Sequence, residues 1–382
     1  MGIEIVTAGE SHGKMLVGIM SNVPAGLIID FDFVNGELSR RMLGLGRGAR
    51  MQIEDDKAEF VSGIRAGVST GSPIAAIINN ADYAAHKREI GPYAEKNGKK
   101  LSAVRPGHAD LAGAIKFGTT DATDIWERAS ARNTAMTVAL GAVAKLYLGV
   151  LGVSVCSHTT GIGIVKAPYA LDYTDINARA DLDKVRCLDK DASEKMVGEI
   201  RMAALSGDTL GGSAEITVTG LIPGIGSFTS GDKRLDGMIS GAVCAVPSVK
   251  AVEIGDGISG AALYGSAFHD EIYPGAKKGE YVRKTNRAGG LEGGMSNGMP
   301  IVVHAYFKPV PTLKNGLNTV DIATGKPVKA ASERSDVCAV PAGGVICEAA
   351  VAIAVAKAIS DTIGGDTMKE VVERYKAKGG AL

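Results

Sequence analysis

Three short motifs place a titratable side chain among small or turn-forming residues. His12 lies in the stretch TAGESHGKM, and His108 lies in RPGHAD, two residues before Asp110. Asp336 follows Arg334 closely in the stretch SERSDVCAVPAGG. A carboxylate beside an imidazole can orient the ring and favour its protonated form, and a carboxylate beside a substrate can accept a proton. The motifs therefore indicate proton transfer, although a loop histidine can equally be inert and Asp336 can equally form a capping ion pair with Arg334.

Arginines gather in two further motifs. The stretches SRRMLGLGRGARM and WERASAR carry, in order, Arg40, Arg41, Arg47, Arg50, Arg128 and Arg132. Guanidinium groups bind phosphate and carboxylate in a bidentate geometry. Ser130, inside the second motif, is a candidate N-cap for a long apolar helix, and cations at a helix N-terminus oppose its dipole unless an anion binds there. The second motif therefore favours an anion site, whereas the first can equally be a solvated basic turn.

Glycine is unusually frequent in this chain. There are 51 glycines among 382 residues, about twice the usual share of roughly 7%. The motif RAGGLEGGMSNG precedes an apolar strand that ends at Lys308 and Pro309. It does not match the GxGxxG fingerprint, which opens a helix in dinucleotide-binding folds. Backbone amides in such a permissive segment could instead approach a planar ring or a phosphate.

Composition excludes several classes of protein. The 42 basic residues balance 42 acidic ones, so no net field attracts nucleic acid or an anionic membrane. The five cysteines form no CxxC pair and no HExxH motif occurs, so we expect neither disulfides nor a metal site. The N-terminus lacks the features of a secretory signal. The two most apolar windows contain Lys145 in one case, and Glu348 and Lys357 in the other, which predicts buried helices rather than membrane spans. We expect a cytoplasmic protein.

The elements that must position these motifs do not alternate strand with helix. Strand-like runs are predicted at residues 3–9, 15–23, 26–31, 58–64, 73–80, 152–165, 213–223, 251–255 and 300–309. Helix-like runs are predicted at residues 32–43, 109–117, 130–151, 193–206, 232–251, 343–363 and 367–378. Hairpin-length Gly/Ser/Thr turns favour antiparallel pairing and an α+β fold. Long polar loops that could carry binding residues are predicted at 86–107, 268–300 and 308–335. No linker divides the chain, so we expect one domain over residues 1–382.

Together the motifs resemble those of the chorismate synthase family. The matching stretches are GESHGKMLVG, RPGHAD, RASAR, RAGGLEGGMSNG, KPVPT and RSDVCAVPAGG, which follow the family's order over essentially the whole chain. The resemblance implies a single-domain β-α-β sandwich with helices between antiparallel sheets, assembled as a homotetramer. It also implies a carbon–oxygen lyase of the shikimate pathway for aromatic amino acid biosynthesis. This lyase converts 5-enolpyruvylshikimate 3-phosphate to chorismate by anti 1,4-elimination of phosphate, with reduced FMN as cofactor and no net redox change.

The resemblance also implies roles for individual residues. His12 would protonate the departing phosphate, His108 would act near the flavin N1 and C2 carbonyl, and Asp336 would remove the ring proton together with flavin N5. The implied anion-binding set, for NADP or for substrate phosphate, is Arg41, Arg47, Arg50 and Arg132; substrate is favoured because no nucleotide fold is apparent. The implied flavin contacts are Arg128, Ala129, Ser130, Pro247, Ser248, Gly293, Lys308, Pro309, Val310, Pro311, Thr312 and Arg334.

Alternatives stay open at the level of the sequence. A flavoprotein oxidoreductase could use the same ring site for net electron transfer, although no NAD(P)H site is legible. A flavin- or anion-binding module without catalysis would not need His12, His108 and Asp336 together. The flavin could be reduced by NADPH on this protein or by a separate flavin reductase. Asn22 and Asn133 depart from the family pattern, which usually has Gly or His at the first position and Glu at the second.

Overall fold

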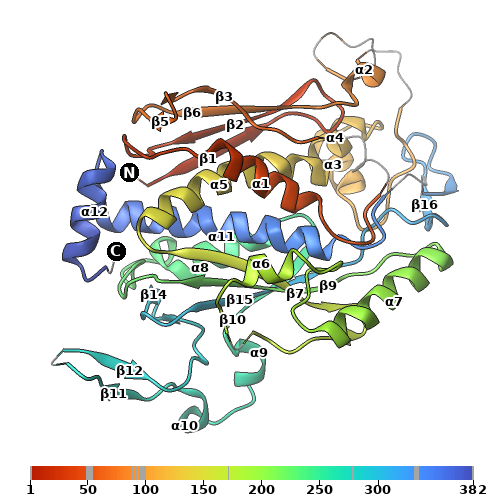
Figure 1. Ribbon diagram of the computed structural model, residues 1–382. Helices are drawn as coiled ribbons and strands as arrows, with labels where there is room; N and C mark the ends of the chain where they lie inside the picture. The colour runs from red at the N-terminus through yellow and green to blue at the C-terminus, as the bar shows by residue number, and fades with distance from the viewer. Residues whose placement is uncertain are drawn as a thin grey trace.

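Two antiparallel sheets form the outer layers of the computed structural model, and long helices lie between them (Figure 1). The structure describes residues 2–48, 55–87, 90, 91, 93, 100–170, 172–277, 279–330 and 335–380. A continuous apolar core extends from Ile3 in the first sheet to Tyr375 near the C-terminus. The predicted α+β sandwich with helices between antiparallel sheets is therefore confirmed.

The first sheet carries His12 in one of its turns. Its strands, in spatial order, are β1 (Glu4–Ala8), β2 (Met15–Ser21), β6 (Ile74–Asn79) and β3 (Glu59–Ser62). Alternate residues of β6, Ile74, Ala76 and Ile78, are buried against the helical layer, as the period of two in a half-covered strand requires. The turn between β1 and β2 holds His12 at the edge of this sheet.

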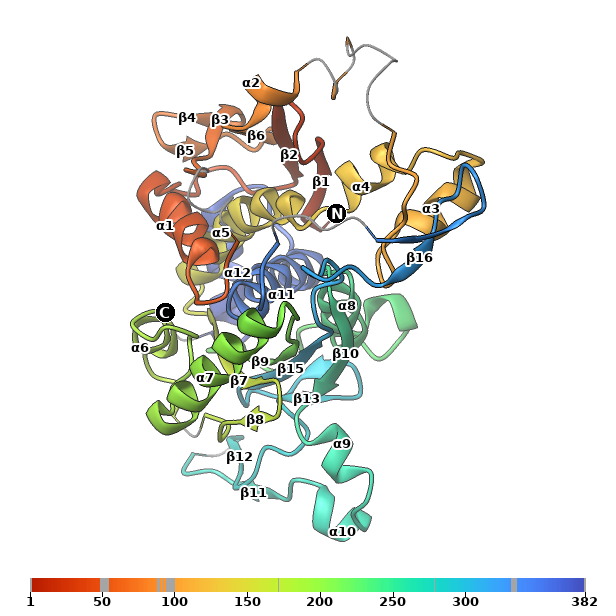
Figure 2. The same ribbon diagram turned by 90° about the vertical axis from the view of Figure 1, so that its right-hand side faces the viewer.

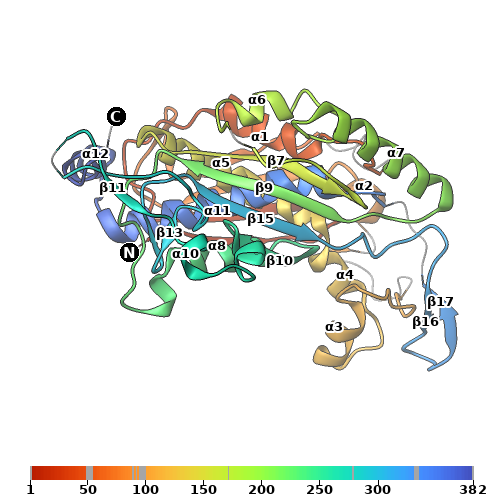
Figure 3. The ribbon, with the colours of Figure 1, turned by 90° about the horizontal axis from the view of Figure 1, so that it is seen from below.

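The second sheet is covered more completely. Its strands, in spatial order, are β10 (Val249–Ile254), β15 (Ile301–Phe307), β9 (Gly212–Thr219), β7 (Ser154–Ile162) and β8 (Val165–Lys166). Figure 3 shows this sheet from below, with α11 behind it. Almost every residue of the inner strand β15 is buried, so its hydrophobic run is continuous rather than alternating.

The middle layer consists of α1 (Phe31–Met42), α5 (Thr134–Val150), α8 (Leu235–Cys244) and α11 (Val340–Ile363). Helices α5 and α11 cross closely because Gly141 faces Ala349; a Cβ added to this glycine would lie only 2.5 Å from the alanine Cβ. The stretches Thr123–Val150 and Val340–Ile363 are long and apolar enough to span a membrane, but 72% and 89% of their apolar windows are buried inside the fold. This is the behaviour of core helices, as the sequence predicted.

Shorter elements surround this frame (Figure 2). The remaining helices are α2 (Tyr83–His86), α3 (Asp110–Phe117), α4 (Thr123–Ala129), α6 (Ile176–Ala180), α7 (Lys190–Ser206), α9 (Gly257–Gly260), α10 (Gly265–Phe268) and α12 (Met368–Ala377), with 3-10 turns η2 (Ala131–Asn133) and η3 (Gly231–Lys233). The small hairpins are β4 (Ile64–Arg65) with β5 (Val68–Ser69), β11 (Ile272–Pro274) with β12 (Tyr281–Arg283), β13 (Leu291–Glu292) with β14 (Met295–Ser296), and β16 (Asn318–Val320) with β17 (Pro327–Lys329).

One predicted helix is too long, and one predicted strand does not form. The helix predicted at 232–251 ends at Cys244, and β10 begins at Val249, because Pro247 lacks an amide hydrogen and disfavours helical backbone before it. The run 26–31 is not a strand, apart from an isolated bridge between Ile28 and Val68.

The helix predicted at 130–151 is also divided differently. Ser130 caps the short turn η2 by accepting from the amide of Arg132 at 3.3 Å, and α5 begins only at Thr134. Arg128 lies in the last turn of the preceding helix α4, where a cation is favourable to the dipole. The unfavourable arrangement that the sequence suggested for Arg128 therefore does not exist.

Candidate active site

Most of the predicted site residues surround one cavity of about 370 Å³. Its lining includes residues of α4 and the turn that precedes α3, and Figure 2 shows these two helices side by side at one edge of the molecule. Six chain segments line it: the loop after α1, the RPGH turn, the α4–η2 junction, the α8–β10 loop, the loop after β15 and the segment before α11. Segments distant in sequence thus converge on one concave surface.

The structure brings together a large part of the predicted set. The predicted residues that line the cavity are Arg41, Arg47, His108, Ala129, Ser130, Arg132, Pro247, Ser248, Lys308, Val310, Pro311, Thr312 and Asp336. The predicted residues that do not line it are His12, Arg128, Gly293 and Pro309. Arg50 and Arg334 lie outside the described residues.

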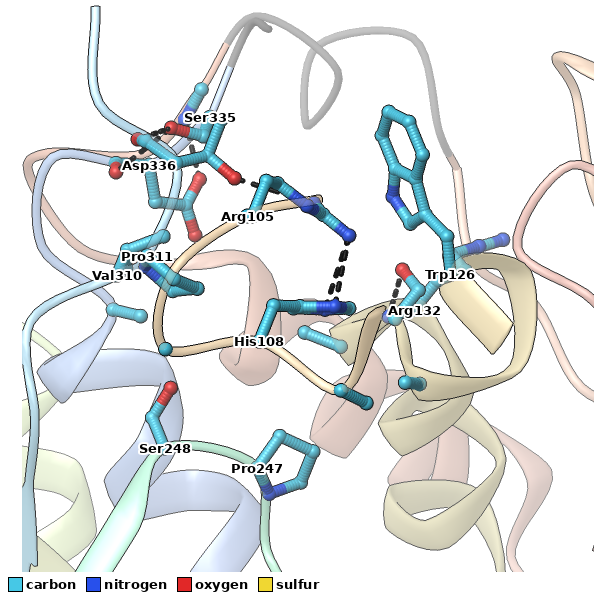
Figure 4. Close-up of a pocket in the computed structure, with 18 of the residues that line it drawn as sticks. Arg105, His108, Trp126, Arg132, Pro247, Ser248, Val310, Pro311, Ser335 and Asp336 are labelled. Carbon is cyan, nitrogen blue, oxygen red and sulfur yellow. Dashed lines mark hydrogen bonds between the residues drawn. The ribbon is translucent and has the colours of Figure 1, made fainter. Parts of the chain in front are cut away.

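The RPGHAD motif forms a compact network in the cavity wall (Figure 4). The carboxylate of Asp110 is fully buried; it accepts from Arg105 Nε at 2.9 Å and from the Arg105 amide at 3.0 Å. His108 Nδ1 lies 2.5 Å from Asp110 Oδ1 and 2.9 Å from Arg105 Nη2. Arg105 Nη2 can only donate, so His108 Nδ1 cannot donate to Asp110 and accept from Arg105 at once. We place a proton on Nδ1, which donates to the carboxylate in the shorter contact.

The hydrogen bonds of this network favour the charged form of the Asp110 carboxyl. Burial alone would raise the pKa of the Asp110 carboxyl, but the hydrogen bonds from His108 and Arg105 outweigh it and hold that pKa well below its usual range. The motif can adopt its turn because Gly107 has φ +80°, a conformation that costs glycine little. The result is an imidazole that an ionised carboxylate fixes in the wall of the cavity.

Asp336, next to Ser335 in Figure 4, lines the same cavity and pairs with Arg47. Its Oδ2 is 3.1 Å from Arg47 Nη1, and its Oδ1 accepts from the Gly48 amide at 2.6 Å. Asp336 thus forms an ion pair with an arginine from the loop after α1, whereas the pair with Arg334 considered from the sequence involves a residue outside the described ones. The guanidinium and the amide hold the carboxylate in a fixed position at the cavity wall.

The arginines of the first basic motif divide into two roles. Arg40 points into the core, where it pairs with Glu37, Asp181 and Glu348. Arg41 lines the cavity, and only 3% of its surface is exposed. A solvated basic turn is therefore excluded for these two residues.

Arg41 lies in an unusually cationic environment. Burial and the nearby guanidinium groups of Arg47 and Arg132 lower the pKa of Arg41 to about 10, although Asp56 opposes them. Asp56 pairs with Arg132 and lies 3.5 Å from Arg41. The three guanidinium groups lie close enough to repel one another, and an anion in the cavity would be attracted to all three.

His12 lies just behind the cavity wall. Its amide donates to Glu127 Oε2 at 2.7 Å, and its Nδ1 lies 2.8 Å from Glu127 Oε1. The neighbouring Ser11 hydroxyl is 3.1 Å from that of Ser130, which does line the cavity. His12 is thus one residue removed from the cavity, and Glu127 orients its ring.

Three other predicted contacts have different surroundings. Arg128 donates to the carbonyl oxygens of Thr7 and Gly9, and it lines an adjoining depression beside α3. Gly293 forms the turn of the β13–β14 hairpin at the opposite end of the sandwich (Figure 1). Pro309 follows Lys308 but is not part of the lining.

Backbone strain marks one wall of the cavity. Ser248 adopts φ +75°, which is unfavourable for a residue with a Cβ, and its carbonyl accepts from the Lys308 amide at 2.9 Å. Burial and the nearby Lys250 lower the pKa of Lys308. Strain of this kind is commonly retained at functional sites.

The two departures from the family pattern have local explanations. Asn22 has φ +62°, a conformation that asparagine tolerates better than most residues, and its side chain donates to the Gly2 carbonyl at 2.8 Å. Asn133 donates to the Arg128 carbonyl at the end of α4. Both side chains thus bond to nearby backbone carbonyl groups.

Sequence reasoning missed several residues of the site. Arg105 lies 4.1 Å from the centre of the Trp126 ring, and both line the cavity. Gly48 and Ser335 line it as well, and Glu127 holds His12. Trp126 is the single tryptophan of the chain. It directly precedes Glu127 and the RASAR motif, and this position next to a recognised motif could have identified Trp126 and Glu127 as candidate site residues.

Fold and site define an α+β protein with a cationic cavity, which is lined by an oriented imidazole and by a carboxylate. The family model for chorismate synthase matches residues 3–360. A chorismate synthase of Carboxydothermus hydrogenoformans is 46% identical over 374 residues, which cover 97% of each chain. One of Anaeromyxobacter dehalogenans is 46% identical over 386 aligned positions, covering 99% of this chain and 100% of the relative.

A solved structure agrees with these sequence relatives. A crystal structure of a chorismate synthase superposes with a TM-score of 0.79 at 34% identity, covering 99% of this chain and 97% of the other. The chain belongs to the chorismate synthase family, and is accordingly a lyase.

Proposed function

We propose that this protein converts 5-enolpyruvylshikimate 3-phosphate to chorismate by anti 1,4-elimination of phosphate, with reduced FMN bound in the cavity. The observation that carries the proposal is the convergence of His108, Asp336 and the cationic side chains on one cavity of about 370 Å³. That volume suits a small-molecule site. The substrate brings one phosphate and two carboxylates, which the cluster of arginines can neutralise.

The lining fits a flavin mononucleotide. Trp126, Pro247, Val310 and Pro311 offer flat apolar surface for a ring system, and Ser130 with nearby cations offers partners for a phosphate. The predicted flavin contacts would hold the cofactor against the RPGHAD turn. When bound, reduced FMN supplies transient electron density that helps the carbon–oxygen bond to break without net oxidation.

The protein's own groups would divide the proton transfers. Arg41, Arg47 and Arg132 bind the anionic substrate and fix its orientation. His12, held by Glu127 at 2.8 Å, donates a proton to the departing phosphate. Asp336 accepts the ring proton, and its contact with Arg47 at 3.1 Å holds the carboxylate in position.

His108 has a different part in this scheme. Asp110 and Arg105 hold its ring at the cavity wall, so it can donate a hydrogen bond near the flavin N1 and C2 carbonyl. A fixed donor at that position stabilises negative charge on the reduced ring.

Further parts of the proposal concern the protein as a whole. We expect residues 1–382 to act as one catalytic domain in a cytoplasmic homotetramer. Arg41 and Arg47 are assigned to substrate phosphate rather than NADP, because their repulsion is best relieved by a compact anion. The flavin would be reduced either by NADPH at this protein or by a separate flavin reductase.

The test is an anaerobic assay. The protein is mixed with 5-enolpyruvylshikimate 3-phosphate and photoreduced or oxidised FMN, and chorismate absorbance and phosphate release are followed. We expect turnover with reduced FMN only, with one phosphate released for each chorismate. Tight FMN binding without phosphate release would contradict the proposal and favour net electron transfer at the same site.

Two variants test the assigned proton transfers. His12→Ala should bind FMN normally but turn over about 100-fold or more slowly, and Asp336→Asn should behave alike. A wild-type rate in either variant would remove that residue from the mechanism.

A further inference from the structure

A second chemical cluster lies where α2 meets the turn between β1 and β2. His12, Asp82 and His86 each offer a ligand atom, and these three atoms all lie within 4.8 Å of one another. Asp82 and His86 are four residues apart at the start and end of α2, so their side chains share one face. The prediction that the chain has no metal site did not consider these residues, because His12 is 70 or more positions from the others in sequence.

We propose that His12, Asp82 and His86 form a binding site for a divalent transition-metal ion of the zinc class. Zn²⁺ binds imidazole nitrogen and carboxylate oxygen at about 2.0–2.2 Å in a tetrahedron, in which two ligand atoms lie about 3.4 Å apart. Asp82 Oδ2 and His86 Nε2 are 3.4 Å apart, so this pair already has the required spacing. Mg²⁺ and Ca²⁺ prefer oxygen ligands throughout, and two imidazoles therefore select against them.

The surroundings of His12 favour the same ligand. Glu127 Oε1 lies 2.8 Å from His12 Nδ1, so the carboxylate fixes the proton on Nδ1 and leaves Nε2 for a metal. A carboxylate that holds the outer nitrogen of a histidine ligand is a common feature of zinc sites. Asp82 and Glu127 together supply two negative charges beside the dication.

The site is open to solvent. The side chains of His12, Asp82 and His86 are 21%, 28% and 33% exposed, so an ion can enter without rearrangement of the core. Their ring and carboxylate atoms, which all lie within 4.8 Å of one another, would supply three of the four ligands that a tetrahedral ion takes. The fourth position stays available for water or for an oxygen of the substrate.

Metal binding would inhibit the lyase. This consequence depends on the proposed role of His12, since a nitrogen that binds a metal cannot also carry the proton for the departing phosphate. The binding step itself does not depend on that role. Metal binding and inhibition can therefore be tested separately.

The first experiment measures binding without activity. Protein without a polyhistidine tag is stripped of metal and titrated with Co²⁺, whose visible absorption is intense in tetrahedral sites, and Zn²⁺ is then added as a competitor. We expect one Co²⁺ per chain, displaced by Zn²⁺, with affinity at least about tenfold lower in both His86→Gln and Asp82→Asn. His269→Gln, at the end of α10 on the far side of the molecule (Figure 1), is the matched control and should bind as the wild type does.

The second experiment measures inhibition in the anaerobic assay. Zn²⁺ should inhibit the wild type and His269→Gln at the concentration that displaces Co²⁺, and a chelator should restore the rate. His86→Gln should keep basal turnover and resist Zn²⁺. Unchanged Co²⁺ binding in both ligand variants, or the absence of a tetrahedral spectrum in the wild type, would overturn the proposed site. A tetrahedral spectrum in a protein without basal turnover would instead contradict the proposed function of the enzyme and leave the metal site supported.

Discussion

Replacement of Asp110 by asparagine should disable the enzyme and destabilise it together. The carboxylate is fully buried and accepts three contacts from Arg105 and one from His108. Asp110→Asn keeps the size of the side chain but removes the negative charge. Arg105, which is only 6% exposed, then keeps its charge in a buried position without its carboxylate partner.

The size of the effect follows from that uncompensated charge. Removal of one partner from a buried ion pair costs about 3–5 kcal/mol. For a chain of 382 residues, the usual unfolding entropy per residue converts this loss into a fall in Tm of about 4–6 °C. Because the asparagine no longer orients His108, turnover should also fall by about 100-fold or more.

The pH dependence has a definite sign. The pKa of Asp110 is lowered in the folded protein from its usual 3.8, so the unfolded chain takes up the proton first. The stabilisation by Asp110 is therefore complete above about pH 4 and is lost as the pH falls through the folded pKa. The variant should lack this part of the acid-induced loss of stability.

Thermal unfolding and the anaerobic turnover assay measure both effects. Asp236→Asn is the matched control, because Asp236 makes a similar two-point contact with Arg234 at the surface, where solvent screens the pair and it contributes little to stability. A wild-type Tm and rate for Asp110→Asn would refute the reasoning, as would an equal loss of stability in the control.

Three further outcomes are expected. Glu348→Gln should lower the free energy of unfolding by about 3–5 kcal/mol, because it leaves Lys145 and Arg40 less compensated in the core; urea unfolding measures this, and a loss below about 1 kcal/mol would contradict it. Burial lowers the pKa of His304, so this histidine takes up a proton at higher pH in the unfolded chain than in the folded protein. The free energy of unfolding should therefore fall as the pH drops below about 6.5. In urea titrations His304→Gln should reduce this dependence of the unfolding free energy on pH, and an unchanged dependence would exclude His304 as its source. Trp126→Ala should weaken FMN binding about tenfold, or about 1.4 kcal/mol, since it removes one wall of the cavity; flavin fluorescence titration checks this, and unaltered affinity would place the ring elsewhere.

Local patterns predicted the framework well. The run 343–363 became the core of α11, and the run 367–378 became α12, because their apolar periods match a helix. Pro247, which prevents a helix from extending to residue 251, was visible in the sequence. Its effect was overlooked because an apolar run continues on both sides of it.

Short-range chemistry was equally accessible. His108 and Asp110 are two residues apart, so a single turn brings them together in nearly any fold. The arginine motifs predicted an anion site, yet they did not show that Arg40 serves the core while Arg41 lines the cavity. Adjacent residues on one helix face different neighbours, and only packing identifies those neighbours.

Residues close along the chain specify the helical and extended runs of this protein and the turn at RPGHAD. The same short motifs also indicate its family. These features depend on residues close along the chain, whose relative positions the backbone restricts. The tertiary structure alone decided the long-range partners. Glu127 holds His12 across 115 positions of the sequence, and Asp336 holds Gly48 across 288. Such contacts exist only because two sheets and the helices between them bury one common core. No local rule specifies which distant side chain that packing brings within hydrogen-bond distance.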